Sequence, residues 1–369
     1  MKAATESMQE LLNERKEQAL YRSLQVPKGL IDFCSNDYLS FARKQRGMQP
    51  SYGHGATGSR SISGNTVYAE KLEQFIADFH GAEAGLLFNS GYDANLGLFS
   101  CIARKTDTLI CDELIHASII DGCRLSYAVR YRFAHNDTRD LEKKLKNAKG
   151  NIFVAVESVY SMDGDTAPLV DIAGLCKKFR AHLIVDEAHA TGVFGQQGRG
   201  LVNAFGLEKE VFARVHTFGK AMGCHGAIVL GSDVLRNYLV NFARSFIFTT
   251  ALPMHSLKII WDAYDQLLEG VFNNQHLHRL IQHFKKGLEL RGDIYLINSI
   301  SPVQSLVIPG SKRCREVASF LQYNGFDVRA ISPPSVPVGK ERLRISLHMH
   351  NSFEQVDQLK QLLNQILLT

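Results

Sequence analysis

The chain has 369 residues, a formal net charge of +5 and 45% hydrophobic residues. This composition is typical of a globular protein and excludes a disordered or collagen-like chain. At roughly 100–200 residues per domain, the length predicts two domains, or one large domain with an appendage. The sequence has no long basic run for nucleic acid and no apolar run near the ~20 residues that cross a bilayer, so we expect neither partner.

The cysteines are seven in number, scattered along the chain, and form no C-x-x-C pair. Disulfide scaffolds and thiolate zinc sites both need closer, paired spacing. The N-terminal residues 1–22 lack the apolar core of a signal peptide. We therefore expect a cytoplasmic protein with free thiols and no metal site.

Short apolar runs then alternate with helical stretches along most of the chain. Residues 1–44 are predicted as an N-terminal helix and segment, and residues 45–255 as a large domain that begins with a glycine-rich loop. The strand-like runs of the large domain are residues 85–88, 108–111, 128–133, 152–157, 182–186, 214–218 and 226–231. Such runs, separated by helices, predict a mainly parallel sheet buried on both faces, in an α/β doubly wound domain.

The pattern changes in residues 256–369. Two helical stretches precede strand-like runs at 304–308, 327–331 and 342–348, and a final helix is predicted over 352–368. This order predicts a smaller C-terminal α+β domain.

Asp186 and Lys220 are the most informative pair of residues. Asp186 ends the run H-L-I-V-D, and Lys220 follows another strand in T-F-G-K-A-M-G. Ligands of open α/β sheets bind at the carboxyl ends of the strands. Desolvation there shifts a lysine toward its neutral, nucleophilic form. The pair suits pyridoxal phosphate, with Lys220 forming the Schiff base and Asp186 holding the pyridinium nitrogen.

Other strand ends supply further candidates. Gly91 opens a helix after a strand and a short turn, so backbone N–H groups there would face a phosphate. His116 could stack on the cofactor ring, and His189, three residues after Asp186, could reach its phenolic oxygen. Glu157 and Ser161 follow a further strand.

Four strings of the sequence, T-F-G-K-A-M-G, D-E-A-H, H-A-S and S-M-D-G-D, resemble the α-oxoamine synthases. These are pyridoxal-phosphate enzymes of the aspartate-aminotransferase fold (fold type I), and the resemblance spans the chain from S-N-D-Y-L at 35–39 to R-L-R-I-S at 342–346. The strings F-A-H-N-D, F-G-Q-Q-G-R-G and P-P-S-V-P look most like the branch that makes 8-amino-7-oxononanoate for biotin biosynthesis.

The resemblance implies a role for each matching position. Lys220, His116 and Asp186 would be catalytic, and His189 would contact the phenolic oxygen. The resemblance implies a phosphate site made of Gly91, Tyr92, Ser161 and Thr217, joined by Thr249 or Thr250 of a neighbouring subunit. That last contact implies a homodimer with shared active sites.

Substrate recognition falls on the C-terminal strands. Period-two alternation places Arg344 on one face of its strand with Arg342, opposite the leucines and isoleucine, and a guanidinium suits an amino-acid carboxylate. The branch often has an arginine where this chain has Ser332, and Ser335 replaces a threonine. Arg22 is the candidate for an N-terminal arginine that meets the acyl chain, although Tyr21 holds the strict position.

The resemblance implies that L-alanine condenses with a pimeloyl thioester, carried by coenzyme A or acyl carrier protein, with release of CO2. Lys220 would remove the Cα proton. The alternatives within the family are glycine C-acetyltransferase, serine palmitoyltransferase and 5-aminolevulinate synthase. An aminotransferase of the same fold, or a non-catalytic partner subunit that only binds the cofactor, would be a different class.

Overall fold

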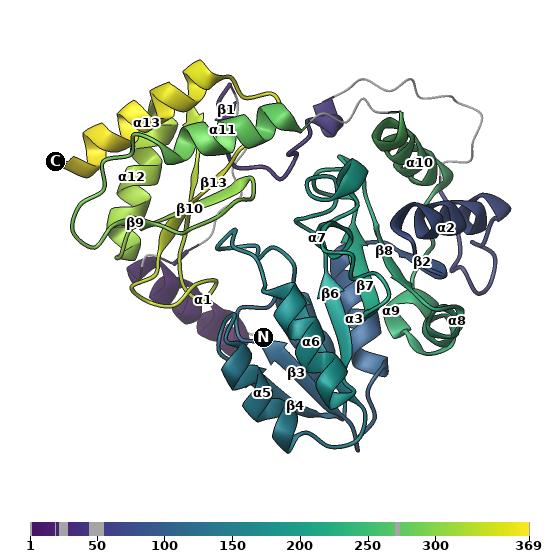
Figure 1. Ribbon diagram of the computed structural model, residues 1–369. Helices are drawn as coiled ribbons and strands as arrows, with labels where there is room; N and C mark the ends of the chain where they lie inside the picture. The colour runs from purple at the N-terminus through teal and green to yellow at the C-terminus, as the bar shows by residue number, and fades with distance from the viewer. Residues whose placement is uncertain (1, 19, 22–28, 44–54, 270–273, 369) are drawn as a thin grey trace. The chain divides into compact units, whose positions relative to one another are not determined.

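A computed structural model describes residues 2–18, 20–21, 29–43, 55–269 and 274–368 of the chain (Figure 1). The chain divides into two compact units. The smaller unit comprises Met1–Ser35, Met162–Asp165 and Gln275–Thr369, and the larger comprises Asn36–Ser161 and Thr166–Asn274.

A seven-stranded sheet forms the centre of the larger unit. Its strands are β2 (Ala84–Phe88), β3 (Thr108–Asp112), β4 (Val129–Phe133), β5 (Ile152–Glu157), β6 (His182–Asp186), β7 (Val211–Thr217) and β8 (Ala227–Gly231). They lie in the order β2-β8-β7-β6-β5-β3-β4. The predicted, mainly parallel sheet is confirmed, and β8 is the antiparallel exception. It returns directly from β7 through a short loop, which permits only an antiparallel partner.

Helices pack on this sheet because the strands present apolar side chains to both faces. They are α2 (Val67–His80), α3 (Gly91–Cys101), α4 (Ala117–Leu125), α5 (Thr138–Asn147), α6 (Leu169–Phe179), α7 (Leu201–Ala204), α8 (Asp233–Phe242), α9 (Arg244–Ile247) and α10 (Met254–Leu268). One core cluster joins α3, α4 and α8 to the strands through residues such as Leu98, Ile119 and Leu239. The edge strand β4 keeps exposed side chains over most of its length.

The smaller unit contains a four-stranded antiparallel sheet in the order β12-β13-β10-β9 and a two-stranded parallel pair, β1 with β11. The elements are α1 (Lys2–Glu17), β1 (Ile31–Asp32), α11 (Gln275–Lys285), β9 (Tyr295–Leu296), β10 (Val303–Val307), α12 (Ser311–Tyr323), β11 (Phe326–Asp327), β12 (Arg329–Ile331), β13 (Arg342–Ser346) and α13 (Phe353–Leu368).

The run predicted as one strand at 327–331 is divided in two. Phe326 and Asp327 pair with β1, and the chain then passes to pair with β13 from Arg329 onward. Val328, fully buried, lies at the change of partner. Periodicity cannot show such a break, because each half remains extended.

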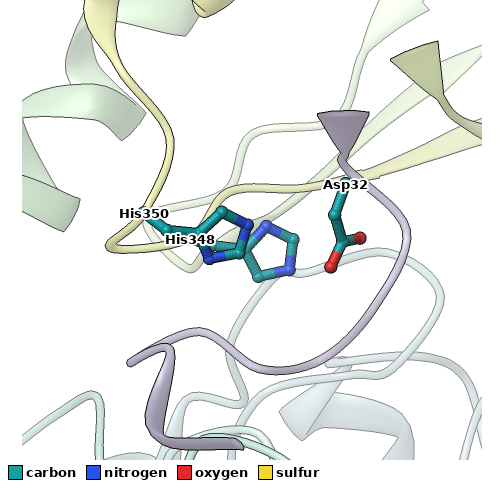
Figure 2. A group of neighbouring side chains, drawn as sticks. All are labelled: Asp32, His348 and His350. Carbon is teal, nitrogen blue, oxygen red and sulfur yellow. The ribbon is translucent and has the colours of Figure 1, made fainter. Parts of the chain in front are cut away.

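Asp32 and His348 tie the first strand of this unit to the segment after β13 (Figure 2). The Nδ1 of His348 faces the Oδ1 of Asn351 at 3.1 Å, and its Nε2 faces the carbonyl oxygen of Ser35 at 3.0 Å. Asn351 Oδ1 also accepts the His348 N–H, which fixes the orientation of the amide. Both ring nitrogens of His348 therefore lie beside oxygen atoms. His348 and the N–H groups of Cys34 and Ser35 hold the pKa of Asp32 below its usual range although burial opposes them.

Across the part of the chain that the structure describes, no helix is both long and apolar enough to cross a membrane.

Candidate active site

Three strands of the larger unit end in polar residues at the same edge of the sheet. Glu157 ends β5 and lies opposite Asp186, which ends β6 and lies opposite Val215 of β7. Lys220 follows β7 by three residues. Electrostatic interactions of Asp186 and Lys220 act on both Glu157 and His116, so the four groups lie within reach of one another.

Asp186 is held by two donors. Its Oδ2 accepts the Asn95 amide at 2.7 Å, and its Oδ1 accepts the backbone N–H of Ala188 at 2.9 Å. Asn95 lies one turn into α3 and also donates to the hydroxyl of Ser118 at 3.0 Å. The carboxylate is only 5% exposed, so it is desolvated and fixed in direction.

His116 stands at the start of α4, where its Nδ1 accepts two hydrogen bonds from Ser118, one from the hydroxyl at 2.7 Å and one from the backbone N–H at 3.2 Å. The remaining proton is therefore on Nε2. Burial, and to a lesser degree the nearby Lys220 ammonium, lower the pKa of His116. The ring is neutral, which suits stacking on an aromatic group.

Glu157 is buried and faces the like charge of Asp186. Burial first, and Asp186 second, raise the pKa of Glu157 to about 8. Its Oε2 accepts the backbone N–H of Ser161 at 3.2 Å, whereas its Oε1 has no hydrogen-bond partner among the described residues. A buried carboxyl oxygen without a partner is costly and points to a group that binds there.

The start of α3 forms a cradle for an anion. Ser90 caps the helix by accepting the N–H of Asp93, and within the described chain the N–H groups of Gly91 and Tyr92 meet no acceptor. A Cβ at Gly91 would approach the Thr217 hydroxyl to 3.3 Å, so only glycine leaves this space open. The two N–H groups are donors of the kind that a phosphate requires. The Thr217 hydroxyl, which here donates to the Gly226 carbonyl oxygen over 3.4 Å, lies beside them.

His189 lies within a buried hydrogen-bonded chain. Its Nδ1 lies 2.9 Å from the hydroxyl of Tyr38, and that hydroxyl also donates to Asn36 at 3.0 Å. Tyr38 belongs to the S-N-D-Y-L string, so this contact links that string to D-E-A-H.

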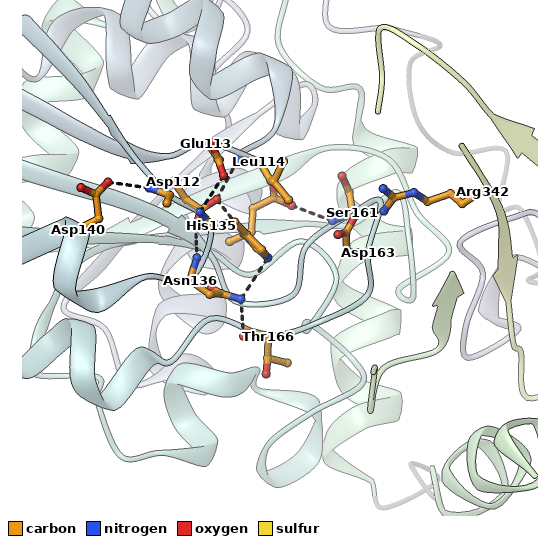
Figure 3. A network of polar contacts seen from close by, with 12 residues as sticks. Asp112, Glu113, Leu114, His135, Asn136, Asp140, Ser161, Asp163, Thr166 and Arg342 are labelled. Carbon is orange, nitrogen blue, oxygen red and sulfur yellow. Dashed lines mark hydrogen bonds and ion pairs between the residues drawn. The ribbon is translucent and has the colours of Figure 1, made fainter. Parts of the chain in front are cut away.

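The loop that carries His116 is supported from the end of β3. Asp112 accepts the N–H of Leu114 at 2.9 Å, the N–H of Asn136 at 2.9 Å and the His135 Nδ1 at 2.9 Å (Figure 3). The F-A-H-N-D string therefore joins the loops after β3 and β4.

Thr249 and Thr250 lie beside the residue that precedes the Ser90 cap. The Asn89 amide donates to the Thr249 hydroxyl at 2.9 Å and to the Thr250 carbonyl oxygen at 2.8 Å. Their predicted contact with a neighbouring subunit stays a prediction.

The predicted substrate residues belong to the smaller unit. Arg344 is buried in β13 and donates to Ser346 at 3.2 Å, whereas Ser335 is exposed. In the same unit Arg342 forms an ion pair with Asp163, whose loop follows the labelled Ser161 (Figure 3). Arg22 lies outside the described residues.

Asn95, Ser118 and Tyr38 were not singled out from the sequence. Asn95 and Tyr38 act through partners 91 and 151 residues away, so no local spacing could indicate their contacts. Two signals were local: Ser118 lies two residues after His116 in the H-A-S string, and Asn95 lies four residues after Gly91 and so on the same side of the helix.

A hollow of about 380 Å³ lies beside α4 and β4, lined partly by Arg124, Arg130 and Arg132. All three side chains are exposed. Arg124 pairs with Asp121 at 3.1 Å, whereas neither Arg130 nor Arg132 forms an ion pair with a described residue. This hollow is therefore positively charged.

Comparison with known proteins gives full-length matches. The family model for class I and II aminotransferases matches residues 28–361. An 8-amino-7-oxononanoate synthase from Emericella nidulans is 44% identical over 97% of this chain and 94% of its own length. The solved 8-amino-7-oxononanoate synthase of Francisella tularensis has a TM-score of 0.75 at 30% identity, covering 91% of this chain and 97% of that chain.

A serine palmitoyltransferase from S. paucimobilis, solved with a bound adduct of PLP and myriocin, has a TM-score of 0.85 at 26% identity, covering 99% of this chain and 97% of that one. The chain belongs to the class I and II aminotransferase family and, within it, to the α-oxoamine synthases.

Proposed function

We propose that this protein binds pyridoxal phosphate and catalyses the decarboxylative condensation of L-alanine with a pimeloyl thioester, which yields 8-amino-7-oxononanoate, CO2 and the free thiol. The observation that carries the proposal is the grouping of Asp186, Lys220, His116 and Glu157 at one sheet edge. The relatives named as 8-amino-7-oxononanoate synthases support the same reaction.

The residues fit the cofactor on three counts. The cradle of Gly91, Tyr92 and Thr217 supplies N–H and hydroxyl donors for the phosphate. The buried, fixed carboxylate of Asp186 would accept a hydrogen bond from the protonated ring nitrogen of the cofactor. The unpartnered Oε1 of Glu157 lies in the same site.

The bound cofactor supplies an aldehyde that captures an amine and a ring that accepts electrons from the bonds at the substrate Cα. The Lys220 Nζ would hold the cofactor and then take the Cα proton of alanine. His116 would cover the ring with its neutral imidazole, and His189, anchored by Tyr38, would orient the phenolic oxygen. Arg344 would bind the alanine carboxylate through a bidentate guanidinium.

The carrier of the acyl group is proposed to dock its phosphates on the arginines of the hollow beside α4 and β4. Arg124, Arg130 and Arg132 offer three guanidiniums around one cavity. Both coenzyme A and the phosphopantetheine arm of acyl carrier protein bear phosphate, which guanidinium groups bind.

Two experiments test the proposal. Borohydride reduction of the cofactor-loaded protein should attach the cofactor to Lys220 alone, as read by peptide mass mapping. A matrix of L-alanine, glycine and L-serine against pimeloyl-, acetyl-, palmitoyl- and succinyl-CoA should release thiol and CO2 fastest with alanine and pimeloyl-CoA. A label at another residue would overturn the site, and a faster pair of substrates would reassign the reaction within the family.

A further inference from the structure

A hollow of about 270 Å³ opens in the smaller unit, and Ser335, one of the predicted substrate residues, lines it. Three segments form its walls: Leu20 and Tyr21 after α1, Arg315 on α12, and residues from the end of β12 onward that include Ser332 and Ser335. All of them belong to the same unit. The lining therefore combines one guanidinium with three hydroxyl groups, a set that recognises an anion.

Arg315 differs from the other basic residues of its helix. Its Nε donates to the carbonyl oxygen of Ser311 at 3.0 Å, which holds the half-buried side chain against α12. Arg313 pairs with Asp293 at 3.0 Å and Lys312 with Glu316 at 3.9 Å. Arg315 forms no ion pair with a carboxylate of the described chain, so its terminal nitrogens can bind the carboxylate of a ligand.

The register of the sheet places this hollow at a useful distance from Arg344. Arg329 of β12 lies opposite Arg344, and Ser332 follows three residues later. At about 3.3 Å per residue, these three steps span roughly 10 Å. The carboxylate carbon of alanine and the far carboxylate carbon of a condensed pimeloyl chain are separated by eight carbon–carbon bonds of about 1.5 Å, which extend over roughly 10 Å.

We propose that Arg315 binds the terminal carboxylate of a dicarboxylic acyl thioester and so selects pimeloyl over a monocarboxylic chain of the same length. The proposal rests on the proposed function and assigns the substrate end that the cofactor site does not contact. Tyr21 and Ser332, the positions where the family resemblance would place an arginine, both line this hollow, and Arg315 brings a guanidinium to it from another element.

The test compares pimeloyl-CoA with heptanoyl-CoA, which has the same length and carrier but no terminal carboxylate, in steady-state kinetics of the cofactor-loaded protein with L-alanine. R315L should raise the KM for pimeloyl-CoA about 10- to 100-fold, the range for losing a charged hydrogen-bond partner. The KM for heptanoyl-CoA, the KM for alanine and kcat should stay within twofold. R315K should restore part of the loss. K312L, an exposed change on the same helix, is the matched control and should change nothing.

Each other outcome has a definite meaning. An equal loss with both thioesters would assign Arg315 to the carrier or to the fold, and a raised KM for alanine would assign it to the amino acid; both overturn the proposal. Calorimetric binding of free heptanedioate, set against heptanoate, gives a readout without turnover. If the wild-type protein condenses neither thioester, the proposed function fails, and heptanedioate binding that R315L abolishes still supports the role of Arg315.

Discussion

Two sets of acids, one in each unit, have different partners. In the smaller unit, Asp163 forms an ion pair with Arg342 and Asp327 with Arg329, and His348 contributes to lowering the pKa of Asp32. At the sheet edge of the larger unit, Glu157 and Asp186 are buried, yet neither forms an ion pair with a described residue. Acids in ion pairs are satisfied within their own unit, whereas the two desolvated acids near Lys220 are placed to meet a bound group.

The largest effect expected from this contrast is on activity. D186N keeps the shape of the side chain but removes the charge, and should lower kcat about 10²- to 10³-fold, the range for one preorganised electrostatic group. The unfolding free energy of cofactor-free D186N should change by less than about 2 kcal/mol, because relief of the repulsion from Glu157 offsets the loss of one of the two hydrogen bonds that the carboxylate accepts. A larger loss of stability would place Asp186 among the structural acids instead.

D32A tests the paired class. Removing this half-buried partner of His348 should lower the unfolding free energy by about 2–3 kcal/mol at pH 7, below the range for fully buried pairs. The folded pKa of Asp32 is depressed, so its stabilisation is fully present above the unfolded value near 4 and is lost progressively as the pH falls from there toward the folded value. Denaturant titrations from pH 7 to pH 3 should show the difference between wild type and D32A constant down to about pH 4 and starting to shrink below it. D32N, which keeps the acceptor oxygen, isolates the charge.

E157Q tests the unpaired class through pH. The pKa of Glu157 in the folded protein is raised to about 8, so the protonated carboxyl stabilises the fold. This contribution is fully present below the unfolded pKa and is lost as the pH rises through 8. The unfolding free energy of the cofactor-free wild type should therefore fall between pH 6 and pH 9 by about 1–3 kcal/mol more than that of E157Q. The pKa of Glu187 is also raised, to about 7, but Glu187 is present in both proteins, so its contribution cancels in the comparison. Parallel pH curves would contradict the assignment.

The smallest effect is expected for S118A. The variant removes the hydroxyl that donates to His116 and accepts from Asn95, so it should cost about 1 kcal/mol of stability. Affinity for the cofactor should fall a few-fold, as measured by fluorescence titration. S100A, a hydroxyl on α3 that donates only to the backbone of its own turn, serves as the control.

Strand ends were the part of the site that the sequence could predict. Glu157 and Asp186 each end an apolar run, and parallel strands bring such ends to one edge. The alternation around Arg344 also agrees with the structure, since Leu343, Ile345 and Leu347 are fully buried. These signals are local, so each is visible within a window of a few residues.

The contacts that orient those groups could not be predicted. The Asn95 amide reaches Asp186 across 91 positions, and Tyr38 reaches His189 across 151. Neither pairing leaves a periodic trace in the sequence. The same holds for Arg315, which reads as an ordinary surface residue of a helix until the fold brings Tyr21 and Ser332 beside it.

The side-chain amide of Asn95 donates two hydrogen bonds, one to Asp186 at the end of β6 and one to the Ser118 hydroxyl that holds the imidazole of His116. An aspartate at position 95 would set a carboxylate against Asp186 and would remove the donor to Ser118, and an alanine would release both partners. Redesign of the site for other amino acids is therefore restricted at Asn95. One side chain holds two partners, Asp186 and Ser118, so a substitution there changes both contacts together.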